Sequence, residues 1–270
     1  MMDDHILGQV ASLWRYPVKS MRGENLNTAF IGYSGVYGDR LYAFKSSKSP
    51  DFFPYFTARD TQDMLRYAPR FRSADAAQQP VNWAVAETTS VGITPLYPEL
   101  ENMMLDVETP SGESFAINDP DLCKQLQASA GEDHQVSLTH SARAMTDCRP
   151  LSLISEQTVT QLSEETGIAI DPRRFRANLY LSLQSRDSKQ TGFAEDSLVG
   201  RTLKIGPKVI ISIVEKDPRC EMVMFDPDTG KSNPAILRNI TQAHQRNAGV
   251  YAAVLVEGIV TSGDSITLIK

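Results

Sequence analysis

The stretch VIISIVEKDPRCEMVMFDPDTG, residues 209–230, carries the strongest signals for both fold and function. Its first six residues are apolar and mostly β-branched, which predicts a buried strand. Residues 215–218, EKDP, read as a charged turn that ends this strand. A short apolar run at 222–225 then leads into the turn cluster DPDTG, which we interpret as a turn that positions Cys220. Cys220 is therefore expected on a constrained loop just after a strand.

Cys220 has a guanidinium neighbour in the chain, Arg219. A nearby cation favours the thiolate, which is the form of cysteine that acts as a nucleophile or binds a metal. The same residue can equally be a small, half-buried hydrophobic side chain. The local sequence does not separate these two interpretations, so the rest of the chain must decide between them.

Size and charge exclude several classes of protein. The 270 residues suffice for one large domain or two ordinary ones. A net charge of −6 speaks against a broad nucleic-acid-binding surface. No apolar run approaches the roughly 20 residues that a membrane-spanning helix needs, and the acidic start MMDDH lacks the features of a signal peptide. We therefore expect a cytoplasmic protein with no membrane span and no nucleic-acid partner.

The cysteines and histidines do not form a recognisable metal-binding pattern. Cys123, Cys148 and Cys220 are widely spaced and include no CxxC pair, so free thiols are expected. The four histidines form neither HxxxH nor HExxH, and the chain has no GxGxxG, Walker or GxSxG motif. Cys123 falls on a predicted helix and is interpreted as packed core.

Short strands dominate the predicted secondary structure. Apolar or alternating runs bounded by Gly, Pro, Asn and Asp predict strands at 9–16, 25–31, 40–44, 83–87, 103–108, 114–117, 134–140, 177–181, 202–205, 209–214, 251–256 and 265–269. Helices are predicted at 61–67, 121–130, 156–166 and 234–246. This mixture predicts an α+β, β-rich fold of the barrel or sandwich class, with a domain boundary near residue 120.

Six fragments occur in an order that is typical of one family. They are YPVKS at 16–20, GDR at 38–40, PLSLISE at 150–156, RFRAN at 174–178, FAED at 193–196, and RC followed by DPDTG at 219–230. Together they resemble the MOSC family, the molybdenum-cofactor sulfurase C-terminal domain proteins, with their N-terminal partner domain. The resemblance implies an N-terminal β-barrel-like domain at 1–120 packed on a C-terminal MOSC β-barrel at 121–270 that carries a few helices.

The resemblance extends to individual positions. Cys220 matches the cysteine whose thiolate binds molybdenum, so it is the expected metal ligand and catalytic residue. Eleven further positions match residues that hold the cofactor or line its site: Lys19, Ser20, Arg40, Asp147, Cys148, Arg149, Arg176, Asn178, Pro218, Arg219 and Tyr251. Cys148 and Arg149 differ from the side chains expected there in the family.

The residue types suit a molybdenum–molybdopterin cofactor. Lys19, Arg40 and Arg176 follow or precede predicted strands and can bind the phosphate of such a cofactor, although lone cations are more often ordinary surface charges. Molybdenum accepts a soft thiolate ligand, which Cys220 can provide. The Arg219 side chain and the bound metal would both hold that thiol deprotonated.

The functional relatives that the resemblance implies are the mitochondrial amidoxime-reducing component and its bacterial counterparts. It therefore implies a molybdenum-dependent reductase that removes oxygen from N-hydroxylated or related N- or S-oxygenated small molecules. Electrons are expected from a separate ferredoxin, flavin reductase or cytochrome, because the chain ends after its last predicted strand without the cysteines of an iron–sulfur domain. Two alternatives remain open. One is a non-catalytic cofactor carrier or a sulfur carrier that uses Cys220, and the other is a scaffold without cofactor.

Overall fold

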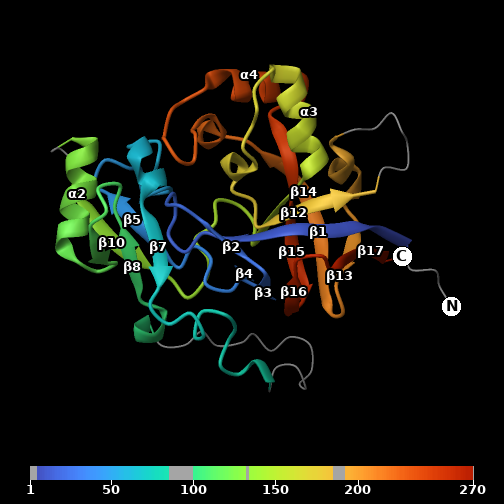
Figure 1. Ribbon diagram of the computed structural model, residues 1–270, viewed down its shortest axis with the longest axis horizontal. Coiled ribbons are helices and arrows are strands. Elements are labelled where there is room, and N and C mark those ends of the chain that lie inside the picture. The colour runs from blue at the N-terminus through green and yellow to red at the C-terminus, as the bar shows by residue number, and fades with distance from the viewer. Residues whose placement is uncertain (1–4, 85–99, 132–133, 185–191, 270) are drawn as a thin grey trace.

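The protein is described by a computed structural model over residues 5–84, 100–131, 134–184 and 192–269. Two β-rich bodies lie side by side, with α3 and α4 at one end of the larger body and α2 on the smaller one (Figure 1). The predicted α+β, β-rich fold is confirmed. None of the helices in these described ranges has the length and apolar character that crossing a membrane requires.

The larger body is a closed barrel of seven strands. In spatial order these are β12 (Leu179–Leu183), β11 (Leu151–Ser155), β15 (Asn247–Val256), β14 (Val209–Pro218), β13 (Thr202–Ile205), β17 (Ser265–Ile269) and β1 (His5–Arg15). β1 pairs with both β17 and β12 and so closes the sheet, while β2 (Glu24–Leu26) pairs with its far end. The first strand of the chain therefore completes a barrel built from its second half, as the blue ribbon among the orange and red strands shows (Figure 1).

Strand β14 illustrates why this sequence forms the barrel. Val209, Ile211 and Ile213 are buried in the barrel core, and the residues between them are only partly buried. The prediction that residues 215–218 form a turn is wrong, because β14 continues to Pro218 and pairs there with β15. Two register shifts accommodate the charged residues. The pairing available from β15 outweighs the local turn preference.

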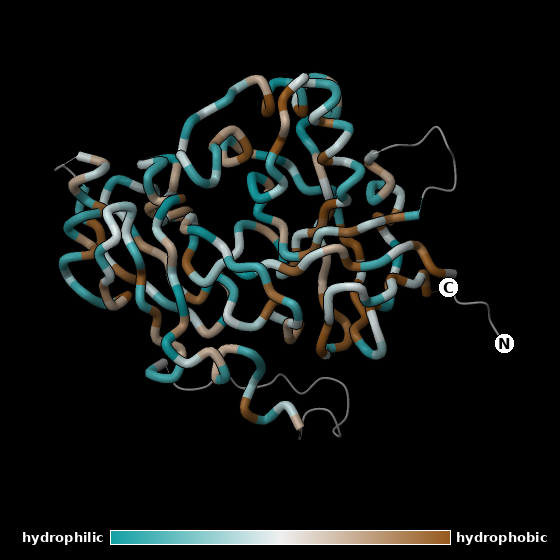
Figure 2. The backbone as a smooth tube through the Cα atoms, in the orientation of Figure 1, coloured by the Kyte–Doolittle hydropathy of each residue, from teal (hydrophilic) through white to brown (hydrophobic). Residues whose placement is uncertain are grey.

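Two helices cover the barrel on one side. α3 (Glu156–Thr166) begins at Ser155, whose side chain accepts a hydrogen bond from the Thr158 N–H, and ends at Gly167, whose φ is 66°. α4 (Pro234–Ala243) begins at Asn233. Both helices add apolar residues to a cluster on the outside of the barrel, separate from the cluster inside it. Hydrophobic segments accordingly lie along the barrel strands in Figure 2.

Among the described residues, the smaller body has two three-stranded sheets around an aromatic-rich core. In pairing order, one consists of β10 (Val136–His140), β5 (Tyr42–Ser46) and β6 (Tyr55–Phe56), and the other of β7 (Ala68–Phe71), β8 (Leu105–Glu108) and β9 (Ser114–Ala116). A further sheet, β16 (Gly258–Thr261), β3 (Thr28–Gly32) and β4 (Gly35–Val36), packs on the barrel, and its Ala29, Ile31, Val36 and Val260 belong to the barrel core. α2 (Pro120–Ala130) contacts β10 and β9. Both bodies take elements from each side of residue 120, so the division at that position stays a proposal.

Several predicted elements need correction. Residues 61–67 contain the 3₁₀ helix η1 (Gln62–Arg66) rather than an α-helix. Trp83 and Ala84 of the strand predicted at 83–87 are helical, and the rest of that prediction lies outside the described residues. β4, β6, β7 and β16 have two to four residues each. Such short strands carry too little periodicity for a pattern to reveal them.

Glu195, in the 3₁₀ helix η4 (Ala194–Leu198), provides a test of what fixes the start of α3. Its side chain is fully buried and accepts hydrogen bonds from the Ser155 N–H (3.0 Å), the Ser155 hydroxyl (2.7 Å) and the Thr158 hydroxyl (2.7 Å). Glu195→Ala removes the acceptor of three buried donors, so we expect the free energy of unfolding to fall by about 3 kcal/mol in urea denaturation. Glu164→Ala, at an exposed position on α3, is the control and should change it by less than about 0.5 kcal/mol. A loss below 1 kcal/mol at Glu195 would contradict this account.

Candidate functional site

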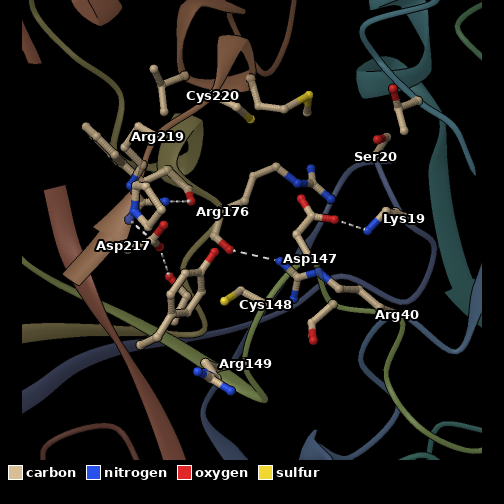
Figure 3. A pocket seen from close by; sticks show the side chains of 18 of the residues that line it. Lys19, Ser20, Arg40, Asp147, Cys148, Arg149, Arg176, Asp217, Arg219 and Cys220 are labelled. Atoms are coloured by element: carbon tan, nitrogen blue, oxygen red, sulfur yellow. Dashed lines mark hydrogen bonds and ion pairs between the residues drawn. The ribbon is translucent and has the colours of Figure 1, made fainter. Parts of the chain in front are cut away.

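A cavity of about 290 Å³ lies where loops of the two bodies meet (Figure 3). All twelve residues predicted for the site line it: Lys19, Ser20, Arg40, Asp147, Cys148, Arg149, Arg176, Asn178, Pro218, Arg219, Cys220 and Tyr251. The fold thus brings together side chains from positions more than 230 residues apart in the chain. Their roles toward a cofactor remain a prediction.

Three lining residues adopt an unusual backbone conformation. Ser20, Arg40 and Arg176 have φ values of 66°, 47° and 51°, a region that residues other than glycine rarely occupy. Backbone hydrogen bonds hold the first loops in place, for example from the Arg40 N–H to the Tyr16 carbonyl (2.7 Å). The Tyr16 N–H in turn donates to the Asp39 carboxylate (2.7 Å). Such strain is typical of sites where the position of a side chain matters more than local stability.

The cavity is strongly cationic although the whole chain is acidic. Its lining includes seven basic residues and two carboxylates: Lys19, Arg40, Arg59, Arg149, Arg174, Arg176 and Arg219 against Asp147 and Asp217. The chain as a whole has a net charge of −6. Concentrating cations in a recess lined by protein raises its affinity for anionic groups. The composition of the cavity therefore favours an anionic ligand.

Arg176 is a buried cation of the cavity that leaves part of its hydrogen-bonding capacity unused. Its Nη1 donates to the Met21 carbonyl (2.8 Å), and its guanidinium lies 4.3 Å from the centre of the Tyr16 ring. Its Nη2 is buried and has no hydrogen-bond partner among the described residues. Burial, with a smaller effect from the positive charge of Arg40, lowers the pKa of Arg176 to about 10. A buried donor of this kind is available for a bound anion.

Lys19 forms an ion pair with Asp147 in the cavity wall. The Lys19 side chain is buried, pairs with the Asp147 carboxylate and donates to the Met145 carbonyl (2.9 Å). Burial alone would raise the pKa of Asp147, but the positive charge of Lys19, together with that of Arg40, holds it below its ordinary value. The bridge fixes the segment before β11 against the loop after β1.

The lowered pKa of Asp147 predicts a small pH-dependent contribution to stability. A carboxyl whose pKa is lower in the folded state stabilises the fold above its unfolded pKa, and this contribution disappears as the pH falls through the folded pKa. Asp147→Asn should therefore reduce the free energy of unfolding by up to about 1 kcal/mol at pH 7, since the carboxylate is half exposed. Urea denaturation at pH 7 and pH 3 measures this. If the difference in free energy of unfolding between the native protein and Asp147→Asn were larger at pH 3 than at pH 7, the lowered pKa of Asp147 would be contradicted.

Cys220 lies at the start of η5 (Glu221–Met224) and is half-buried at the edge of the cavity. The guanidinium of its neighbour Arg219 is directed elsewhere (Figure 3). It donates to the Ala248 carbonyl (2.6 Å) and the Phe175 carbonyl (3.0 Å) and pairs with Asp217 (2.8 Å). The expected effect of Arg219 on the thiol is therefore not supported by a direct contact, because the guanidinium is held by partners on β14, β15 and η3 (Pro172–Phe175).

Two family profiles match this chain. The MOSC N-terminal β-barrel domain matches residues 7–149, and the MOSC domain matches residues 140–267. The chain belongs to the MOSC family. MOSC domains are related to the C-terminal domain of molybdenum-cofactor sulfurase and are associated with binding of the molybdenum cofactor.

Solved structures also resemble this MOSC protein. The YuaD protein from Bacillus subtilis is 14% identical over 97% of this chain and 96% of that chain, with a TM-score of 0.47. YiiM from Geobacillus stearothermophilus is 19% identical over 45% of this chain and 54% of that chain, with a TM-score of 0.35. These similarities are too low to support a functional assignment. No curated protein matches the sequence.

The two residues that differ from the family pattern, Cys148 and Arg149, share one partner in this MOSC protein. The Cys148 thiol donates to the Glu215 carboxylate (3.4 Å), and the Arg149 guanidinium donates to the same oxygen (2.7 Å). Burial and the negative charge of Glu215 raise the pKa of the Cys148 thiol. Both residues are exposed at the edge of the cavity, and Cys148 is favoured as a neutral thiol there.

Asn178 serves the barrel as well as the cavity. Its side-chain carbonyl accepts from the Ser152 N–H (3.3 Å) and its amide group donates to the Trp14 carbonyl (3.3 Å). Both functional groups of the amide are therefore used to join β1, β11 and β12. Asn178 is placed to position the preceding loop, including Arg176, and its contact with a cofactor stays a prediction.

Sequence reasoning missed other lining residues, chief among them Asp217, Ser152, Arg174 and Arg59. Ser152, Arg174 and Asp217 lie within or next to the fragments that resemble the family, so their neighbourhood was a usable signal. Arg59 comes from a segment with no such signal. Cys123, as predicted, contributes to the core of the smaller body, where it is half-buried and burial raises its pKa.

Proposed function

We propose that this MOSC protein is a molybdenum-cofactor-dependent reductase of N-hydroxylated or related N- or S-oxygenated small molecules. The observation that carries the proposal is that one cationic cavity contains Cys220 together with Lys19, Arg40 and Arg176. A soft metal ligand and a set of phosphate-binding cations are the two requirements of a molybdopterin site.

The described residues fit such a cofactor. The buried Nη2 of Arg176 lacks a protein partner and can donate to a phosphate oxygen. Ser20 and Arg40, held at positive φ on neighbouring loops, can supply a hydroxyl and a second cation. Cys220 would provide the thiolate ligand to molybdenum. When bound, the cofactor would supply two-electron redox chemistry, and the chain would bind it, orient it and limit access of water.

Electrons would come from a separate protein of the ferredoxin, flavin reductase or cytochrome type. Reduction of an N-hydroxyl group to an amine consumes two electrons and two protons and releases water. The chain's own contribution is then to admit a small substrate beside Cys220 and to supply protons at the oxygen that leaves.

Metal analysis combined with an activity assay tests the proposal. Protein from a host that makes the cofactor should contain close to one equivalent of molybdenum and convert benzamidoxime to benzamidine with a reduced viologen dye. Protein from a host that cannot make the cofactor is the matched control and should do neither. Molybdenum-loaded protein that leaves benzamidoxime and S-oxides unchanged would contradict the reductase assignment.

A second candidate is a carrier of cofactor or of sulfur. The observation that favours it is that two free thiols, Cys148 and Cys220, line the same cavity. A sulfur carrier would hold a persulfide on Cys220, which cyanide releases as thiocyanate. Molybdenum-free protein that gains cyanide-labile sulfur on Cys220 would support this function over the reductase.

A further inference from the structure

The carboxylate of Asp217 lies near the C-terminal end of β14, a strand whose other buried side chains are aliphatic. Asp217 is 1% exposed and lines the cavity. It follows Val209, Ile211 and Ile213 along the buried side of the strand, with the register shifts of β14 in between. Burying a carboxylate is costly, so a purely structural position of this kind would be better filled by an apolar residue.

Three side chains surround this carboxylate. The Ser152 hydroxyl donates to it (2.8 Å), and Arg219 Nη2 lies 2.8 Å away from the same oxygen. Tyr251, on the neighbouring strand β15, interacts with it electrostatically. Tyr251 is paired in register with Ser152 on β11 and with Glu215 on β14, so three adjacent strands fix the cluster.

Tyr251 is the most exposed of the four side chains in this cluster. All four line the cavity, but Asp217, Ser152 and Arg219 are buried, whereas Tyr251 is only partly buried. Arg219 also donates to two carbonyl groups. The Tyr251 hydroxyl is therefore the group of this cluster best placed to pass a proton from Asp217 to a ligand.

We propose that Asp217 and Tyr251 form a proton relay that delivers a proton to the oxygen leaving the substrate. The inference rests on the reductase function proposed above. As the N–O bond breaks, the Tyr251 hydroxyl gives its proton to the leaving oxygen and takes one from Asp217, so the phenol stays neutral. The bound cofactor would supply the electron pair, received from the donor protein. The oxygen leaves as water, the nitrogen takes the second proton from solvent, and solvent reprotonates Asp217.

The electrostatics of the cluster agree with this assignment. Burial raises the pKa of Asp217, and the charge of Asp147 raises it further, while Arg219, the hydrogen bond from Ser152 and the nearby Tyr251 lower it, with a net increase. Burial and the charge of Asp217 raise the pKa of Tyr251. A carboxyl with an increased pKa can hold a proton nearer neutral pH, whereas an isolated phenolate beside Asp217 is disfavoured.

The test in the loaded enzyme uses Tyr251→Phe, which keeps the ring and removes the hydroxyl. We expect reduction of benzamidoxime to slow by about 10²- to 10⁴-fold, the usual contribution of a general acid, with the molybdenum content unchanged. The native rate should decline as the pH rises and Asp217 ionises, and Asp217→Asn should slow the reaction similarly and remove this decline. Tyr33→Phe, which lies against the barrel core and outside the cavity lining, is the matched control. Native rates in Tyr251→Phe, or loss of its molybdenum, would overturn the relay.

A second readout needs no cofactor and separates this inference from the proposed function. In the apo-protein labelled with ¹³C-tyrosine, the resonance absent from Tyr251→Phe identifies Tyr251. Asp217→Asn should lower the pH at which that resonance titrates, because it removes the charge that opposes phenolate formation. An unchanged titration would refute the coupling of the two residues. Failure of native loaded protein to reduce any substrate would instead refute the reductase function.

Discussion

Cys220→Ala should lose more than nine-tenths of its molybdenum and reduce benzamidoxime at least about 10³-fold more slowly than the native protein. The physical reason is that Cys220, directly before η5, would offer a soft thiolate ligand to the metal, and alanine cannot replace it. Because Cys220 is half-buried at a loop and makes no cap hydrogen bond, its removal should cost less than about 1 kcal/mol of stability. Elemental analysis, a reduced-dye assay and urea denaturation measure the three quantities.

Cys123→Ala is the matched control for this substitution. Cys123 lies in the core of the smaller body and does not line the cavity. The Cys123→Ala protein should retain molybdenum and activity even if its free energy of unfolding falls slightly. Cys220→Ser adds a harder oxygen ligand and should recover part of the metal but little of the rate. Full molybdenum content and full activity in Cys220→Ala would show that the Cys220 thiol is not the metal ligand.

Arg176→Met should reduce cofactor retention by at least about 100-fold and leave the apo-protein as stable as before, or more stable by about 1 kcal/mol. Cofactor retention falls while apo stability does not, because the buried guanidinium of Arg176 lacks a hydrogen-bond partner when no ligand is bound. Its Nη2 is buried and unpartnered among the described residues, and Arg40 lies close enough to lower its pKa. Methionine keeps most of the apolar contact with Tyr16 and removes the buried charge. Binding of an anion would reverse this balance in the native protein.

Arg173→Met, from the same loop, is the control for Arg176. Arg173 pairs with Asp171 and with Asp228 outside the cavity. It should keep the cofactor and lose a little stability, since surface-exposed ion pairs are worth up to about 1 kcal/mol each. Cofactor retention and apo stability are measured by elemental analysis and by thermal unfolding of cofactor-free protein. A large loss of apo stability in Arg176→Met would show that the guanidinium is structural.

The amino-acid sequence by itself determined the local features of this protein. The β-branched run at the start of β14 forms a buried strand, and Ser155 and Gly167 begin and end α3, because strand preference and capping depend on neighbours in the chain. The sequence also identified the cations and the thiol of the site, through the fragments that resemble the MOSC family. Seven of the twelve predicted residues that line the cavity lie in these fragments, and the other five came from further positions of the same resemblance.

The tertiary structure alone decided how those residues are used. The pairing of β1 with β12 and β17 closes the barrel, and the pairing of β14 with β15 extends a strand through a sequence that reads locally as a turn. The same pairing buries Asp217, which then binds the Arg219 guanidinium away from Cys220. These outcomes depend on contacts between strands far apart in the chain, so no local preference of residues 215–220 encodes them.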